Sequence, residues 1–147
     1  MKTISKTTAD FGLPWETDYG YAQAVKVGDT IYLAGQLGHD DQGRIVVPAL
    51  TDADPKVSAQ AAMEVQMQQA YVNARTILAR FGASLDNVVE EVLYVLDMDS
   101  AFAVAGRVRK AAYGVERPQV ASTIIVTPRL ALPGQLIEIK FIARVQI

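Results

Sequence analysis

Residues 134–145 read GQLIEIKFIARV, and the alternation of side chains in this stretch decides the fold that we expect. Successive side chains of a β-strand point to opposite sides of the sheet, so a strand here has two distinct faces. One face is wholly apolar and comprises Ile137, Ile139, Phe141, Ala143 and Val145. We therefore predict a strand over residues 135–145 whose apolar face packs against helices.

The opposite face of this strand mixes aliphatic and charged side chains. It comprises Leu136, Glu138, Lys140, Ile142 and Arg144. Either water reaches this face, or a partner covers it, or it lines a site. A face that is half apolar and half charged is more typical of a subunit interface than of a solvent-exposed surface, so we expect an oligomer.

Glu138 has two interpretations on this face. Its carboxyl group could act as a general acid or base, or orient a water molecule. It could equally form a structural ion pair, either with Lys140 two residues along or across the interface. The alternation of residues is compatible with both.

The remaining elements follow from periodicity and turn residues. The predicted strands are a hairpin around Gly28-Asp29 within YAQAVKVGDTIYLAGQ, a short strand at 44–47, a buried strand at 88–96, and a strand at 119–127 joined to the last strand through Pro133-Gly134. The predicted helices are residues 58–81, between a Ser58 cap and Gly82, and a second helix from Asp99 or Ser100 to Tyr113.

This order of elements predicts an α+β fold, a mixed sheet with both helices on one face. We expect a single domain over residues 1–147, in which residues 1–19 form an N-terminal arm. A sheet covered on one side only leaves its second face for a partner or a ligand.

The composition excludes several classes of function. A net charge of −2 offers no basic stripe for a phosphate backbone, so nucleic acid is not an expected partner. The absence of cysteine excludes disulfides, thiolate catalysis and thiolate-ligated metals, and one histidine excludes multi-histidine metal sites. No apolar run of about 18 residues or secretory leader is found. We expect a cytoplasmic protein without a metal or a membrane span.

Several further residues have a structural and a functional interpretation. Gly35 lies at a strand end, where glycine either forms a bulge or lets a ligand approach the backbone. His39 is interpreted as a solvated loop residue, because no nucleophile accompanies the neighbouring aspartates. The basic residues Arg107, Arg109 and Lys110 are interpreted as a solvated helix face, and Tyr113 as a packing residue.

From about Gly20 onward the chain resembles the RidA/YjgF family. Five stretches carry the resemblance in order: GYAQAVKVGDTIYLAGQ, ILARFGASLDNVVEEVLYVLDM, DSAFAV, RPQVAST and LPGQLIEIKFIARV. The resemblance implies the chorismate-mutase-like α+β fold, a homotrimer, and pockets in the clefts between subunits. It also implies hydrolysis of reactive enamines and imines to keto acids and ammonia, without metal or cofactor. Some relatives are called endoribonucleases, and the acidic net charge weighs against that activity here.

The resemblance also implies a set of site residues. Tyr21 matches the family's pocket tyrosine, Gly35 the glycine of close backbone approach before Gln36, and Glu138 the carboxylate held near a water molecule. A positioned water and a proton for the departing nitrogen are what C=N hydrolysis needs. Tyr21 and Glu138 are therefore the candidate catalytic residues.

The chain departs from the deaminase branch of that family at one position. An arginine that binds the substrate carboxylate there is replaced by Ala121, and such a contact is worth about 1.5–3 kcal/mol. Simple 2-imino acids are therefore not the expected substrates. Thr123 shares the strand face of Ala121, and Arg129 could substitute for the missing arginine. The substrate-binding candidates are therefore Gly35, Gln36, Ala121, Thr123, Arg129 and Glu16.

The leading functional hypothesis is a cofactor-free, deaminase-like hydrolase that acts on an enamine, an imine or a related small metabolite. The alternative is a non-catalytic protein that binds a small molecule or regulates through the same clefts between subunits. Nuclease activity ranks below both.

Overall fold

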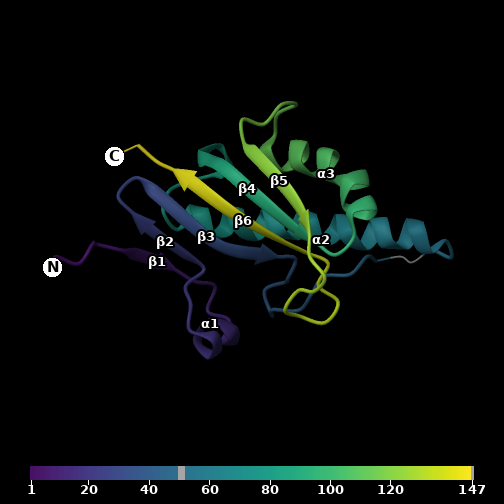
Figure 1. The fold of residues 1–147 in the computed structure, drawn as a ribbon, viewed down its shortest axis with the longest axis horizontal. Coiled ribbons are helices and arrows are strands. Elements are labelled where there is room, and N and C mark those ends of the chain that lie inside the picture. The colour runs from purple at the N-terminus through teal and green to yellow at the C-terminus, as the bar shows by residue number, and fades with distance from the viewer. Residues whose placement is uncertain (50–51, 147) are drawn as a thin grey trace.

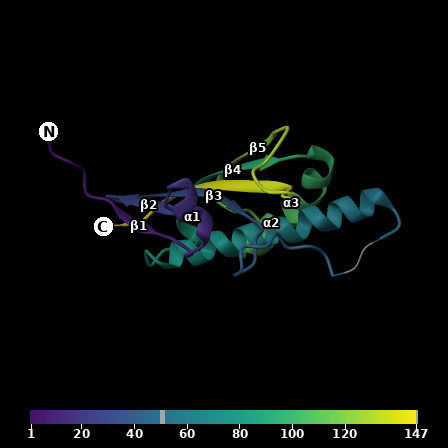
Figure 2. The same cartoon turned by 90° about the horizontal axis from the view of Figure 1, so that it is seen from below.

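The computed structural model describes residues 1–49 and 52–146, and within them a six-stranded sheet carries two long helices on one face (Figures 1 and 2). The strands are β1 (Thr7–Ala9), β2 (Ala24–Val27), β3 (Thr30–Leu37), β4 (Val88–Val95), β5 (Ala121–Val126) and β6 (Ile137–Arg144). The helices are α1 (Pro14–Tyr19), α2 (Pro55–Ala79) and α3 (Met98–Tyr113), with a 3₁₀ turn at Leu85–Asn87. The α+β prediction is confirmed.

The sheet has the order β1-β2-β3-β6-β4-β5, with β6 in its interior. All neighbours are antiparallel except β4 and β5, which are parallel. The predicted hairpin through Pro133-Gly134 is therefore wrong. Parallel strands need a crossover, which α3 provides between β4 and β5, and the chain then passes beyond β4 to place β6 between two partners.

The apolar face of β6 forms the centre of the core, as its alternation predicts. Four of its five predicted residues are fully buried: Ile137, Ile139, Phe141 and Ala143. Helix α2 packs on the same side of the sheet with Met63, Met67, Ala70, Ala74, Ile77 and Leu78, which are 0–1% exposed. Burying one large apolar side chain contributes about 1.5–3 kcal/mol, so the four large residues of this stripe together contribute roughly 6–12 kcal/mol to folding.

One predicted strand is absent from the structure, and one strand that was not predicted is present. Residues 44–47 form no strand, and only an isolated bridge joins His39 to Ile45. The additional strand is β1 in the N-terminal arm, where Thr8 lies opposite Val25 on the edge of β2. The arm forms this strand because its backbone gains hydrogen bonds to β2. A strand of three residues is too short to show a recognisable pattern in the sequence.

Both long helices begin earlier than predicted. The Asp54 side chain accepts a hydrogen bond from the Lys56 N–H, and Pro55 occupies the first helical position. Asp97 caps α3 in the same way through the Ser100 N–H, at 3.0 Å. The cap residues predicted from the sequence lie inside the first turn of each helix. The prediction missed the caps because several adjacent residues have side chains suited to capping.

A buried ionic network joins four elements beneath the sheet. Glu91 of β4 faces the helices with a fully buried side chain and accepts hydrogen bonds from the hydroxyls of Tyr71 and Tyr113 at 3.0–3.1 Å. Arg109 Nε lies 2.5 Å from Glu91 Oε1, and Ser122 Oγ lies 2.9 Å from it. Burial, and then the Glu91 charge, raise the pKa of both tyrosines. The carboxylate therefore ties α2 and α3 to β4 and β5.

This network corrects the interpretation of the basic residues on α3. Arg109 turns inward to Glu91, whereas Arg107 and Lys110 stay at the surface and pair with Glu64 and Glu116. Arg109 lies one helical turn after Ala105, which is buried, so its position on the helix and not its charge determines where it points.

No helix within residues 1–49 and 52–146 combines the length and the apolar character needed to cross a membrane.

Candidate functional site

A cavity of about 310 Å³ lies where β3 ends and β6 begins. Three segments surround it: α1 with the residues that follow it, the end of β3, and the loop before β6 joined to the start of that strand. Its lining comprises Trp15, Tyr19, Tyr21, Ala34, Gly35, Leu37, Ala131, Leu132 and Glu138. Three candidates from the sequence, Tyr21, Gly35 and Glu138, therefore share one cavity.

Glu138 is the acidic residue of this lining. It lies opposite Leu37 in the β3–β6 register, and its carboxyl group is partly buried. Burial raises the pKa of the carboxyl, while a hydrogen bond from Gln135 Nε2, at 3.4 Å, acts in the opposite direction. Within the described residues Glu138 forms no ion pair, and Lys140 is exposed. Within this part of the chain no cationic side chain therefore neutralises the carboxyl group.

Gly35 makes room for this carboxyl group. A Cβ atom at this position would lie 1.9 Å from Glu138 Oε1 and 2.5 Å from the Cδ and Cγ atoms of the same side chain. The pairing of β3 with β6 also shifts between Leu33 and Gln36, so the strand is irregular here. The bulge interpretation of the glycine applies, and the group found against its backbone is the side chain of Glu138. The close approach of a ligand stays a prediction.

Tyr21 borders the cavity with a hydroxyl that accepts a long hydrogen bond from Gln23 Nε2, at 3.4 Å. Burial raises the pKa of this tyrosine, and the nearby Glu16, Glu138 and Asp10 charges raise it further. The phenol therefore keeps its proton near neutral pH and can donate a hydrogen bond into the cavity.

Two other candidates have structural partners instead. Gln36 is buried on the helix side of β3, where its Nε2 donates to Gln23 Oε1 and to the Ala34 carbonyl, both at 2.9 Å. The buried Glu16 carboxylate accepts hydrogen bonds from the three N–H groups of residues 11–13, at 2.7–2.9 Å. Neither side chain lines the cavity, and Glu16 fixes the start of α1.

The remaining candidates lie elsewhere in the protomer. Ala121 and Thr123 are exposed on the edge strand β5, which β4 separates from β6. Thr123 lies opposite Val92 in the β4–β5 register. Arg129 lies beside a separate hollow formed by the loop that precedes β6. A single protomer does not bring these three residues to Glu138.

Helix α1 contributes two aromatic residues that the sequence did not assign to the site. Trp15 and Tyr19 are four residues apart, so both lie on one face of the helix, and both line the cavity. The spacing within PWETDY is the signal that could have found them. His39 supports this wall: its ring packs edge-on against Phe11 and Trp15, with centroids at 5.1 and 5.3 Å.

The prediction that His39 is solvated is wrong. Only 3% of the residue is exposed, and Nδ1 lies 2.8 Å from the Asp40 carbonyl oxygen. The N-terminal arm covers the loop that follows β3, and aromatic contacts between distant segments cannot be read from the local sequence.

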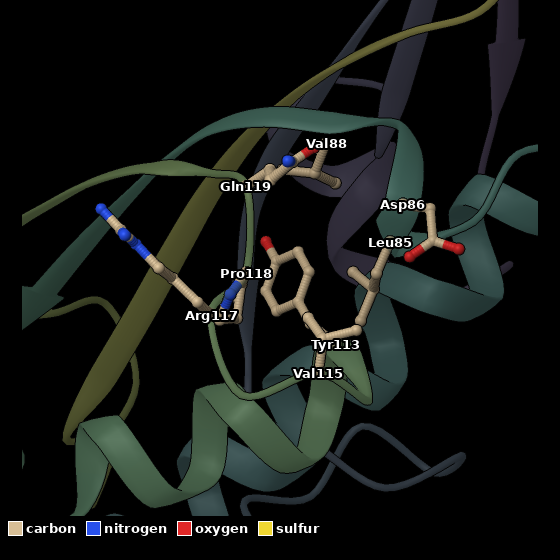
Figure 3. A pocket seen from close by; sticks show the side chains of 8 residues that line it. All are labelled: Leu85, Asp86, Val88, Tyr113, Val115, Arg117, Pro118 and Gln119. Atoms are coloured by element: carbon tan, nitrogen blue, oxygen red, sulfur yellow. The ribbon is translucent and has the colours of Figure 1, made fainter.

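A second cavity, also about 310 Å³, lies at the C-terminal end of α3 (Figure 3). Tyr113 forms one wall with Leu85 and Pro118, while the Arg117 side chain points away from the ring. None of the candidate site residues lies there. The cavity at Glu138 is therefore the better candidate site.

The raised pKa of Glu138 predicts an effect of pH on stability. A carboxyl group whose pKa is higher in the folded state stabilises the fold while it is protonated, and this contribution is lost as the pH rises through the folded pKa. Glu138→Gln should therefore increase the midpoint of urea unfolding at pH 7–8. At pH 3 the variant and the wild type should have the same midpoint. A lower midpoint for the variant at pH 8 would contradict the burial of this charge.

Comparisons with known proteins find relatives of this chain by sequence and by structure. Residues 15–145 match the family model described as Endoribonuclease L-PSP. A RutC family protein of Pyrococcus abyssi is 31% identical over 125 residues, which cover 84% of each chain. The 2-iminobutanoate/2-iminopropanoate deaminase of Mus musculus is 30% identical over 124 residues, covering 84% of this chain and 79% of that protein.

Solved structures of related proteins have the same fold. RidA from the Antarctic bacterium Psychrobacter superposes with a TM-score of 0.67 at 29% identity, over 99% of this chain and 100% of that one. A member of the YjgF/YER057c/UK114 family from Mycobacterium tuberculosis superposes with a TM-score of 0.70 at 29% identity, over 96% of this chain and 100% of that one.

Proposed function

Since the chain belongs to the endoribonuclease L-PSP family, which includes the RidA and YjgF proteins, we propose that it hydrolyses an enamine or imine without a cofactor. The observation that carries this proposal is the convergence of the Glu138 carboxyl group and the Tyr21 hydroxyl on one cavity. The mouse relative is named a deaminase of 2-imino acids, so C=N hydrolysis is the reaction class with the most support.

The two side chains suit the two halves of this reaction. Glu138, as the carboxylate, takes a proton from water while the water oxygen attacks the carbon of a protonated imine. The nitrogen receives the π electrons, and a carbinolamine forms. Glu138 then returns the proton to the nitrogen, the C–N bond breaks, and ammonia leaves as the hydroxyl becomes a carbonyl. The released hydroxyl proton passes to ammonia.

Tyr21 has an orienting role in this scheme. Because its pKa is raised, the phenol donates a hydrogen bond and does not become an anion that competes with Glu138. Gly35 admits the carboxyl group close to the backbone of β3, so water and imine can meet beside it.

We propose further that the active unit is a homotrimer with the open face of the sheet covered by neighbouring subunits. That face exposes Tyr32 and Ile125, at 46% and 43%, opposite the side covered by the helices. Apolar residues exposed on the one sheet face that no helix covers support the burial of this face against a partner. In such an assembly Ala121 and Thr123 of one subunit would border the cavity of the next, whereas Arg129 would remain beside its own hollow.

Simple 2-imino acids rank second among the proposed substrates. We propose, from the resemblance, that Ala121 occupies the position of the arginine of the deaminase branch. No Lys, Arg or His lines the cavity within the described residues of the protomer. A substrate carboxylate would meet Glu138 without a cation to offset the repulsion. An imine or enamine without a carboxylate is therefore proposed first.

The alternative is a non-catalytic protein that binds a small molecule in the same cavity. The aromatic lining supports this alternative, because such a lining suits ligand binding whether or not a reaction follows. The two proposals differ in what happens to a bound imine. Binding alone would slow its decay or leave it unchanged, whereas catalysis releases ammonia.

An assay with imines made in situ separates these proposals. An amino-acid oxidase or a pyridoxal-phosphate lyase supplies the imine, and ammonia release is followed with wild type and with Glu138→Gln. We expect wild type to accelerate release and the variant to lose about 10²-fold or more of that acceleration, the usual contribution of a general base. Light scattering of the same preparation should show three times the 15.9 kDa chain mass.

Equal rates with and without wild type on every imine would reject the catalytic proposal. A monomer at micromolar concentration would reject the shared cleft. Lys140→Gln serves as the control for charge removal on β6, because Lys140 is exposed on the same face of the strand and does not line the cavity.

A further inference from the structure

The wall that α1 contributes to the cavity is aromatic and held in place. Trp15, Tyr19 and Tyr21 supply three rings to a lining whose other members, apart from Glu138, are glycine and aliphatic residues. The indole of Trp15 packs against His39 on one side, and the loop at Gly43 lies so close that a Cβ there would be 2.9 Å from the ring. A ring fixed in this way binds a ligand without a large ordering cost.

The charges around this wall have one sign. Glu138 lies inside the cavity, and Glu16 and Asp10 border a groove on the other side of Tyr21. Burial raises the pKa of the Tyr21 phenol most, and the charges of all three carboxylates raise it further. No Lys, Arg or His among the described residues lines either hollow to offset them.

We infer that this cavity recognises a cation, a protonated imine or amine attached to an aromatic or bulky apolar group, and rejects carboxylates. The inference rests on the proposed function for its reaction, but its binding part stands on the lining alone. The faces of Trp and Tyr rings attract a cation through the ring quadrupole, and a partly buried carboxylate adds a direct charge partner. The apolar group of the ligand would lie against Leu37 and Leu132.

The same features explain how selectivity would arise before any chemistry. A protonated imine is both the form that water attacks and the form that the negative field concentrates. A 2-imino acid carries a carboxylate that the field opposes, so it would be bound less well than an aryl or alkyl imine. Trp15 and Tyr19 are therefore proposed as specificity-determining residues.

A matched series of small probes tests the binding part without any turnover. Benzylammonium, benzyl alcohol and benzoate have similar shape but carry a positive, zero and negative charge. Trp15 is the one tryptophan of the chain, so its fluorescence reports ligands at this wall directly. We expect benzylammonium to change the emission and to bind about 10-fold or more tightly than benzyl alcohol, with no saturable binding of benzoate.

Two variants assign the effect to the proposed residues. Tyr19→Ala should weaken benzylammonium about 5-fold or more without unfolding the protein, because Tyr19 is 75% exposed. Glu138→Gln should remove most of the preference for the cation over the alcohol. Phe102→Ala, at another highly exposed aromatic on α3, should change neither affinity.

The outcomes distinguish this inference from the proposed function. Benzoate binding as tightly as benzylammonium, or unchanged affinity in Tyr19→Ala, overturns the inference even if imines are hydrolysed. Preferred binding of benzylammonium without hydrolysis of any imine supports the inference and rejects the proposed function. If both hold, benzyl-substituted imines should be hydrolysed with a higher kcat/KM than 2-iminopropanoate, and the reverse order overturns the inference.

Discussion

Glu91→Ala is expected to lower the free energy of unfolding by about 3–5 kcal/mol, the usual cost of removing one partner of a buried ion pair. The substitution leaves the Arg109 guanidinium without its counter-charge and the hydroxyls of Tyr71 and Tyr113 without their acceptor. Because these groups come from both long helices, their loss also loosens the contact of α2 and α3 with the sheet. Urea unfolding followed by circular dichroism measures the change.

Glu90→Ala is the matched control for this prediction. Glu90 precedes Glu91 on β4 but is exposed, so its removal should change stability by no more than about 0.5 kcal/mol. A double variant, Glu91→Leu with Arg109→Met, should recover much of the loss because no buried charge is left unpaired. A Glu91→Ala protein as stable as the Glu90→Ala protein would show that the network contributes nothing to the fold.

Gly35→Ala is expected to reduce imine hydrolysis by about 10²-fold or more, as much as Glu138→Gln, although it removes no functional group. The new Cβ would occupy the space of the Glu138 carboxyl group, at 1.9 Å from Oε1, so the side chain must leave its position. Since the obstacle is a side chain and not backbone, the protein should still fold. Ammonia release and urea unfolding of the same variant separate the two effects.

Gly106→Ala is the control for this second prediction. Gly106 is exposed within α3, and no atom lies within 4 Å of its hypothetical Cβ. Alanine in an exposed helical position stabilises by about 0.5–1 kcal/mol, so this variant should be more stable and equally active. Full activity in Gly35→Ala would mean that the position of Glu138 in the structure is not the one that reaction requires.

The parts of the fold that were predicted correctly depend on local alternation. Ile139 and Phe141 are buried because a strand places alternate residues on one side, and Met63 and Met67 are buried because a helix repeats every 3.6 residues. Such a pattern predicts burial correctly without knowledge of the neighbours, because each element buries its apolar side against whichever element packs on it.

The errors concern partners that are distant in sequence. The proposed pairing of the last two strands failed because adjacency along the chain is weak information about adjacency in the sheet, and β6 found better partners in β3 and β4. Arg109 was interpreted as solvated because it clusters with other basic residues, and His39 because no nucleophile accompanies the neighbouring aspartates. Glu91, which pairs with Arg109, and the aromatic residues of the N-terminal arm, which cover His39, are distant in sequence from these two residues.

Local patterns in the sequence were enough to assign the apolar faces of the elements, to locate the two long helices to within a few residues, and to select Tyr21, Gly35 and Glu138 as candidates. The folded structure was needed to show that these three border one cavity, that Glu16 and Gln36 have structural partners, and that the N-terminal arm contains α1 with its aromatic wall. Alternation along a chain reports which side of an element avoids water. Which side chains of different elements come into contact depends on sheet order and register, and these are set only when all the elements pack together.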